Sequence, residues 1–285
     1  LIAVTTAALV RAPNWIDLYG LAAEVLPEEK AAEALSIIDR GLEIAPLSIA
    51  LLNEKRRTLR ELERSDEALA VFARMRELAP DSVMGYHGET LLHEDEGRFA
   101  DAIYWSTRTM GVDPDDHELP AFVAQYLLML GLTEEAAPWV RRAELLNASG
   151  SDTQRVLIQY AERSGDSARA LALSKEVLRA KRDNRRWVYG IAAIHYMALM
   201  DEAGKLDEAL AFMDTVSPGM AKLPPPAPQS EFDLVVQSVA AGYLVRGADL
   251  AERKLRVDGL RASLQKGAPD FDVEDDVFGA VLAEM

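Results

Sequence analysis

The sequence contains no cysteine among its 285 residues. This absence excludes disulfide bonds, catalysis by a thiolate and zinc sites built from thiolate ligands. It leaves the compartment open, because a cysteine-free chain suits the cytoplasm and the periplasm alike, and of the two we favour the cytoplasm.

Long apolar runs are also missing. No stretch reaches the roughly 18 to 20 apolar residues that a membrane-spanning helix requires. We therefore expect a soluble protein without membrane insertion. Residues 1–13 lack the charged start of a signal peptide, and they read better as the end of a helix that Pro13 closes.

Motifs that carry chemistry are absent as well. The sequence holds no nucleophile elbow, no phosphate-binding glycine loop and no dinucleotide-binding fingerprint. Residues 93–96, HEDE, are rich in metal-ligand types, but they lack the HExxH spacing that places two imidazoles on one helical face. We therefore predict a non-enzymatic protein with no catalytic residues, no metal site and no cofactor.

Basic residues are in deficit. Lysine and arginine number 31 against 47 acidic residues, which gives a net charge of -16. A field of this sign repels phosphates, so nucleic acid is not expected as a partner.

What the sequence does have is a repeat. Alanine recurs every 34 residues at five positions, and glycine and proline recur in the same register. Residues 83–114 show the repeated unit most clearly: two short amphipathic helices that meet at Gly97 and end at Pro114. Abundant Ala, Leu and Glu favour helix, so we predict an all-α protein. The recurring residues are Ala34, Ala68, Ala102, Ala136 and Ala170, then Gly97, Gly131 and Gly165, and Pro46, Pro80 and Pro114.

The repeat divides the chain into segments. Residues 1–13 are read as the end of a preceding repeat helix, so the chain is expected to begin inside a repeat. Residues 217–230 are a proline-rich connection, 231–269 a final long helix pair, and 270–285 an acidic and apolar tail that forms a capping helix or occupies the groove. The six repeats between them span 14–46, 47–80, 81–114, 115–148, 149–182 and 183–216.

This pattern resembles the tetratricopeptide repeat family, whose units are helix pairs of 34 residues. The resemblance implies a right-handed α-solenoid of about six to seven antiparallel pairs. Alanine stands at the twentieth position of five repeats, where a small side chain lets the two helices approach. The Leu-Gly pair that the family has on its first helix is replaced, for example by Glu89-Thr90, which predicts looser or shifted helix contacts.

The resemblance also implies a groove lined by the first helix of each repeat. Four polar or basic residues stand out there because the protein around them is acidic: Asn53, Arg57, Arg60 and Arg155. We expect their side chains to bind the carboxylates of a ligand. The alternative is that these arginines pair with Glu54, Glu61, Glu94 or Glu162 on solvated helix faces. The predicted groove residues are Tyr19, Asn53, Arg57, Arg60, His87, Leu91, Glu94, Gln125, Arg155 and Gln159.

These observations predict a scaffold that holds an acidic or extended segment of a protein or peptide in its groove. One alternative is a substrate-recognition or regulatory region of a larger enzyme or bacterial regulator, because similar repeats have that role in some members of the family that this sequence resembles. Another is a module that assembles with copies of itself into a homo-oligomer.

Overall fold

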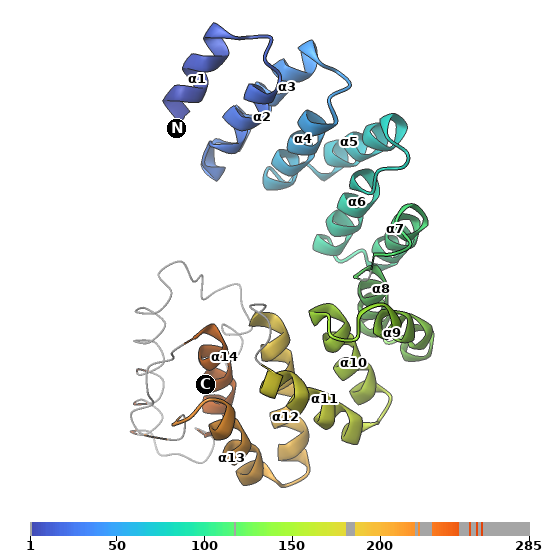
Figure 1. The fold of residues 1–285 in the computed structure, drawn as a ribbon, viewed down its shortest axis with the longest axis vertical. Helices are drawn as coiled ribbons and strands as arrows, with labels where there is room; N and C mark the ends of the chain where they lie inside the picture. Colours follow the sequence, from blue (N-terminus) through green and yellow to red (C-terminus); the bar gives the residue numbers. More distant parts are fainter. Residues whose placement is uncertain are drawn as a thin grey trace. The chain divides into compact units, whose positions relative to one another are not determined.

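The computed structural model describes residues 2–116, 118–180, 186–219 and 230–244, together with single positions at 222, 251, 255 and 258. Within them the chain is helical and has no strand, which confirms the predicted all-α class (Figure 1). None of the helices in these ranges is long and apolar enough to cross a membrane. The elements are α1 (Ile2–Arg11), α2 (Asp17–Glu24), the 3-10 helix η1 (Glu28–Lys30), α3 (Ala31–Ile44), α4 (Ile49–Glu61), α5 (Ser65–Leu78), α6 (Met84–Asp95), α7 (Phe99–Val112), α8 (Leu119–Met129), α9 (Thr133–Asn147), α10 (Ser151–Arg163), α11 (Ser167–Ala180), α12 (Arg186–Glu202), α13 (Leu206–Val216) and α14 (Glu231–Leu244).

The chain divides into two compact units, unit 1 (Leu1–Leu130) and unit 2 (Gly131–Met285). In unit 1 each first helix packs against the second helix that follows it, giving the pairs α2–α3, α4–α5 and α6–α7. Helices α2, α4 and α6 follow one another along one side, which we call the first-helix side, and α3, α5 and α7 run along the other (Figure 1). The repeated Ala34, Ala68 and Ala102 are all buried within these pairs, as a close helix contact requires.

The turn inside each pair has a left-handed residue at one repeat position. Gly97, Gly131 and Gly165 have φ angles of +70°, +77° and +81°, and Glu63 occupies the same position with φ +56°. In this conformation the next amide reaches back to the ending helix: Arg98 N donates to His93 O at 2.8 Å. The bond satisfies a carbonyl that the helix end would otherwise leave open.

The close contact between α5 and α6 occurs at glycines. A Cβ atom on Gly88 would lie 2.3 Å from Cε1 of the buried Phe72, and one on Gly85 would lie 2.9 Å from Cγ of Arg76. The neighbouring Glu89 and Thr90, where the family has its Leu-Gly pair, are both buried. The two helices therefore approach closely at these glycines, and Gly88 leaves no room for a side chain.

Unit 2 has its largest core around α12. Tyr189 of α12 meets Phe232 of α14 edge to face, with ring centroids 4.9 Å apart, and Tyr196 meets Phe212 of α13 at the same distance. The small residues Ala170 and Ala209 are fully buried in α11 and α13.

Several predicted segments lie outside the described residues. They are most of the proline-rich connection at 217–230, the second helix of the pair predicted at 231–269, and the whole tail at 270–285.

Candidate functional site

A groove on the first-helix side of unit 1 is the candidate site. It lies between α2 and α4, reaches the first residue of α6, and encloses about 530 Å³. We call it the α2–α4 groove. Its apolar lining includes Leu21 and Met84, whose side chains are 42% and 37% exposed and so remain available for contact. The apolar and glycine lining consists of Ile16, Gly20, Leu21, Ile49, Ala50, Leu51 and Met84.

Local structure fixes both walls of this groove. The Ser48 side chain accepts a hydrogen bond from Leu51 N at 3.3 Å and caps the start of α4. Gly20, in the middle of α2, leaves a gap in the wall: a Cβ atom there would meet only Leu51 Cδ2 at 3.8 Å and Glu54 Cγ at 3.9 Å. These are ordinary van der Waals distances, so this glycine is open to the groove and is not required by helix packing.

Carboxylates dominate the polar part of the lining. Asp17 and Glu24 come from α2 and Glu54 from α4, with Ser48 and Asn53 as the neutral polar members. None of the described residues that line the groove is a lysine or an arginine. The groove therefore has an apolar floor and an acidic edge.

The prediction that Tyr19 lines the groove is wrong. Its side chain is 2% exposed, its Cβ lies against Gly41 of α3, and its hydroxyl donates to Pro13 O at 2.9 Å. Tyr86 makes the matching bond to Pro80 O at 3.1 Å. Tyr19 is therefore the counterpart of Tyr86, and the surface residues of α2 come one position later, at Gly20 and Glu24.

The sequence contained a signal for this shift. Pro13 precedes Pro46 by 33 residues, whereas Pro46, Pro80 and Pro114 are 34 apart. The first repeat is thus one residue shorter between its prolines. Counting from the alanine of the second helix places α2 one residue out of register, which is why the prediction does not include Gly20 and Glu24.

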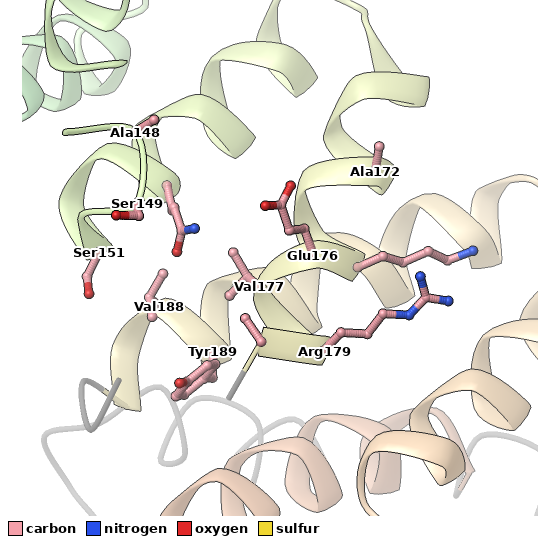
Figure 2. Close-up of a pocket in the computed structure, with 12 residues that line it drawn as sticks. Ala148, Ser149, Ser151, Ala172, Glu176, Val177, Arg179, Val188 and Tyr189 are labelled. Carbon is pink, nitrogen blue, oxygen red and sulfur yellow. The ribbon is translucent and has the colours of Figure 1, made fainter. Parts of the chain in front are cut away.

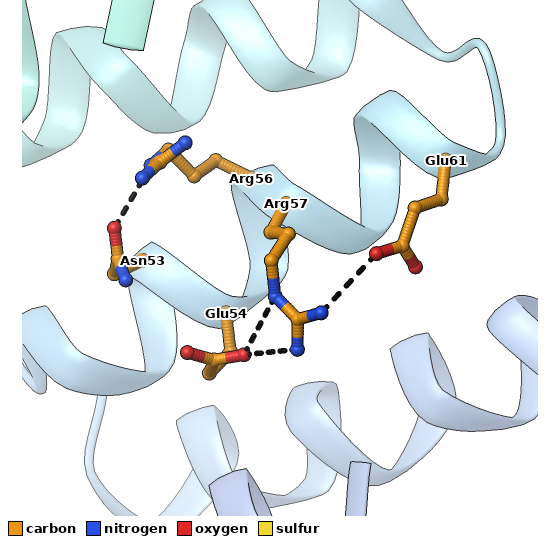
Figure 3. A network of polar contacts seen from close by, with 5 residues as sticks. All are labelled: Asn53, Glu54, Arg56, Arg57 and Glu61. Carbon is orange, nitrogen blue, oxygen red and sulfur yellow. Dashed lines mark hydrogen bonds and ion pairs between the residues drawn. The ribbon is translucent and has the colours of Figure 1, made fainter. Parts of the chain in front are cut away.

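Arg57 is exposed on α4, but its charge is compensated. Its Nη2 lies 2.7 Å from Glu54 Oε2 and its Nη1 lies 3.2 Å from Glu61 Oε1, as Figure 3 shows. The hydrogen bond that Arg57 donates to Glu54, together with the charges of Glu54, Glu61 and Glu24, raises the pKa of this guanidinium. This is the ion pairing on a helix face that the sequence left as the alternative.

The other two polar residues predicted on α4 also have partners. Arg60 Nη2 lies 2.7 Å from Asp95 Oδ2. Asn53 Oδ1 accepts a hydrogen bond from Arg56 Nε at 2.9 Å (Figure 3), and burial is the main cause that lowers the pKa of Arg56. Arg57 and Arg60 therefore have little free charge to offer an acidic ligand.

The predicted residues of α6 and α8 are half-buried. These are His87, Leu91, Glu94 and Gln125. Glu94 accepts a hydrogen bond from the hydroxyl of Tyr126 at 2.9 Å, which joins α6 to α8. Asn53 is the member of the predicted set that lines the α2–α4 groove itself.

Next to the groove helices lies a buried polar cluster that the sequence did not indicate. Arg76 of α5 bonds to the Glu89 carboxylate and donates to Gly85 O at 2.7 Å, and its guanidinium lies 4.2 Å from the ring centre of Trp105. Glu89 also faces His93 Nε2 at 3.8 Å. Burial raises the pKa of Glu89 against the opposing effect of Arg76. The cluster ties α5, α6 and α7 together.

Unit 2 holds the remaining predicted residues, Arg155 and Gln159 on α10. Arg155 is mostly buried and its Nη2 lies 3.0 Å from Asp152 Oδ1. A separate pocket of about 810 Å³ lies between α10, α11 and α12, with Val177 and Val188 on its walls. Figure 2 shows the Arg179 side chain of this pocket pointing away from Ser149 and Ser151. No group of three or more metal-ligating side chains occurs among the described residues of either unit.

Comparison with solved structures identifies the fold. A tetratricopeptide repeat protein from Parabacteroides merdae is 12% identical with a TM-score of 0.58, over 98% of this chain and 97% of that one. PilF of Pseudomonas aeruginosa is 11% identical with a TM-score of 0.55, over 72% and 92%. A chain of the Cut9–Hcn1 hetero-tetramer is 18% identical with a TM-score of 0.53, and the match spans 99% of this chain but 52% of that one. No family model and no curated protein matches the sequence.

Proposed function

We propose that this chain, which has the tetratricopeptide repeat fold, is a non-enzymatic scaffold that binds an extended segment of a partner protein in the α2–α4 groove. The observation that carries the proposal is the open apolar floor around Gly20, Leu21 and Met84. A volume of about 530 Å³ lies within the range of binding pockets and can receive an apolar side chain of the partner. The likeness to a chain of the Cut9–Hcn1 assembly supports a role in protein association.

Burial of apolar surface supplies the affinity in this proposal. Leu21 and Met84 are partly exposed, and covering them removes apolar area from water at roughly 25 cal/mol per Å². A single anchoring side chain in a preformed pocket is the usual centre of such an interface.

The groove does not favour the acidic segment that the arginines suggested. Arg57 already contacts two glutamates and Arg60 one aspartate, so carboxylates of the same chain already balance the charge that a ligand carboxylate would meet. The chemistry that the groove offers instead is apolar contact.

Replacing Gly20 by leucine tests the proposal. The new side chain has room at its Cβ and fills the groove, and helix stability gains because glycine is a weak helix former. We expect wild type to enrich apolar peptides from a displayed random library and Gly20→Leu to lose that enrichment.

Gly111→Leu is the matched control. A Cβ atom at Gly111 meets nothing within 4 Å, and the position lies on α7, away from the groove. This variant should enrich the same peptides as wild type. Identical enrichment by wild type and a folded Gly20→Leu variant would show that the groove is not the binding site.

A further inference from the structure

The charge at the edge of the α2–α4 groove points to the class of partner. We infer that the groove selects a segment in which an apolar residue is flanked by lysine or arginine, a specificity that rests on the proposed function of the groove. The inference comes from the carboxylates of Asp17, Glu24 and Glu54, which line the groove without a lining cation.

Two of these carboxylates are available to a ligand. Neither Asp17 nor Glu24 forms an ion pair with a described residue, although Glu24 acts on Arg57 through its charge. Arg57 is shared between Glu54 and Glu61, so one guanidinium stands against several carboxylates. The edge therefore keeps a negative charge that a cationic ligand can neutralise.

The spacing of the two acids sets the spacing of the cations. Asp17 and Glu24 are seven residues apart, two turns along α2, and so share one face of the helix. A rise of about 1.5 Å per residue separates them by roughly 10 Å along the axis. A peptide in the extended polyproline II conformation rises about 3.1 Å per residue with three residues per turn, so side chains three positions apart lie about 9 Å apart on the same side. The expected segment has basic residues three positions apart with an apolar residue between them.

The chain's own tail does not fit this groove. Residues 270–285 carry six acidic side chains and no lysine or arginine, so their charge has the same sign as the groove edge. A partner segment rich in Asp or Glu is disfavoured for the same reason. An external basic and apolar segment is the occupant that complements both the floor and the edge.

The experiment sorts a displayed peptide library with one fixed leucine and randomised flanks against the full chain. We expect Lys and Arg to be enriched around the leucine, three positions apart. In Asp17→Asn/Glu24→Gln that cation preference should disappear while selection for the leucine remains. A synthetic peptide with lysines at the selected positions should bind wild type about tenfold more tightly than its glutamine counterpart, as two exposed ion pairs together provide, and added salt should reduce the difference.

Asp101→Asn/Glu202→Gln is the matched control. It removes one carboxylate from the first turn of a helix and one from a helix end, as the groove variant does, but at α7 and α12. It should keep the cation preference.

The outcomes separate the two proposals. Selection for leucine without cations overturns the charge inference and leaves the proposed function standing. Loss of all selection by wild type overturns both. Enrichment of Asp or Glu overturns the inference in favour of an acidic partner. A molar mass in light scattering that increases with concentration for wild type, but not for Asp17→Asn/Glu24→Gln, overturns it in favour of a second copy of this chain.

Discussion

At the scale of single residues, glycines decide where helices come close and where the surface is open. Gly88 faces the ring of Phe72, so its missing side chain is required by packing. Gly20 has only ordinary contacts at its Cβ position and opens the groove. The two residues are the same type on first helices of two repeats, and only their neighbours distinguish a structural role from a binding role.

The Phe72 contact leads to a prediction on stability. Gly88→Ala places a Cβ 2.3 Å from Cε1 of a fully buried ring, and such overpacking costs about 1 to 3 kcal/mol, which exceeds the helix-propensity gain of up to about 1 kcal/mol. We expect a net loss in the free energy of unfolding, measured by urea denaturation.

Gly111→Ala is the control for that variant. It makes the same exchange in α7 where nothing lies within 4 Å, so it should raise stability by about 0.5 to 1 kcal/mol. If both variants change stability in the same direction, the close contact at Phe72 is not the cause.

At the scale of elements, the turn within each helix pair depends on one backbone conformation. Gly97, Gly131 and Gly165 take a left-handed φ without strain, whereas Glu63 takes it at a cost that β-carbon contacts impose. Both kinds of residue close the same hydrogen bond, since Arg64 N donates to Leu59 O at 2.9 Å as Arg98 N does to His93 O. The packing of the helix pair therefore sets the turn geometry, and glycine only lowers the backbone strain of adopting it.

Substitutions at equivalent turn positions are predicted to change the free energy of unfolding in opposite directions. Gly97→Ala should lower the free energy of unfolding by about 1 kcal/mol, because the left-handed backbone conformation is strained for alanine and not for glycine. Glu63→Gly should raise it by up to about 1 kcal/mol by relieving that penalty. Thermal unfolding followed by circular dichroism measures both. A stability loss in Glu63→Gly would mean that the glutamate makes a contribution outweighing its backbone strain.

At the scale of the whole molecule, the helices from α2 to α11 contact mainly their neighbours along the chain, as is typical of repeat arrays, whereas α14 packs mainly on α12. Local stability in such an array should follow local packing. Hydrogen exchange resolved by peptide tests this. We expect Gly88→Ala to speed exchange in α5 and α6 and to leave α10 and α11 unchanged.

The reciprocal variant belongs to unit 2. Ala170 is fully buried in α11, so Ala170→Leu should speed exchange in α10 and α11 and leave α5 and α6 as in wild type. Uniform acceleration along the whole chain in either variant would indicate that the array unfolds as one cooperative block.

The sequence by itself determined the helix pairs. Ala68 and Ala102 are small where two helices must approach, and Gly97 allows the turn, so a 34-residue period in these residue types specifies the local fold. These features depend on neighbours along the chain, and the local pattern therefore predicts them.

The tertiary structure decided which side chains face the groove and which charges remain free. Tyr19 is buried because a one-residue difference in the first repeat rotates α2, and a helix turns by about 100° per residue. Arg60 is paired because α6 brings Asp95 within 2.7 Å of it. The burial of Tyr19 is indicated by the 33-residue spacing of Pro13 and Pro46, whereas the pairing of Arg60 depends on a residue of another helix, whose position the local pattern does not contain. For that reason the sequence predicted that Arg57 and Arg60 would be free to bind carboxylates, whereas in the folded chain both are paired and the neighbouring α2–α4 groove has an apolar floor and an acidic edge.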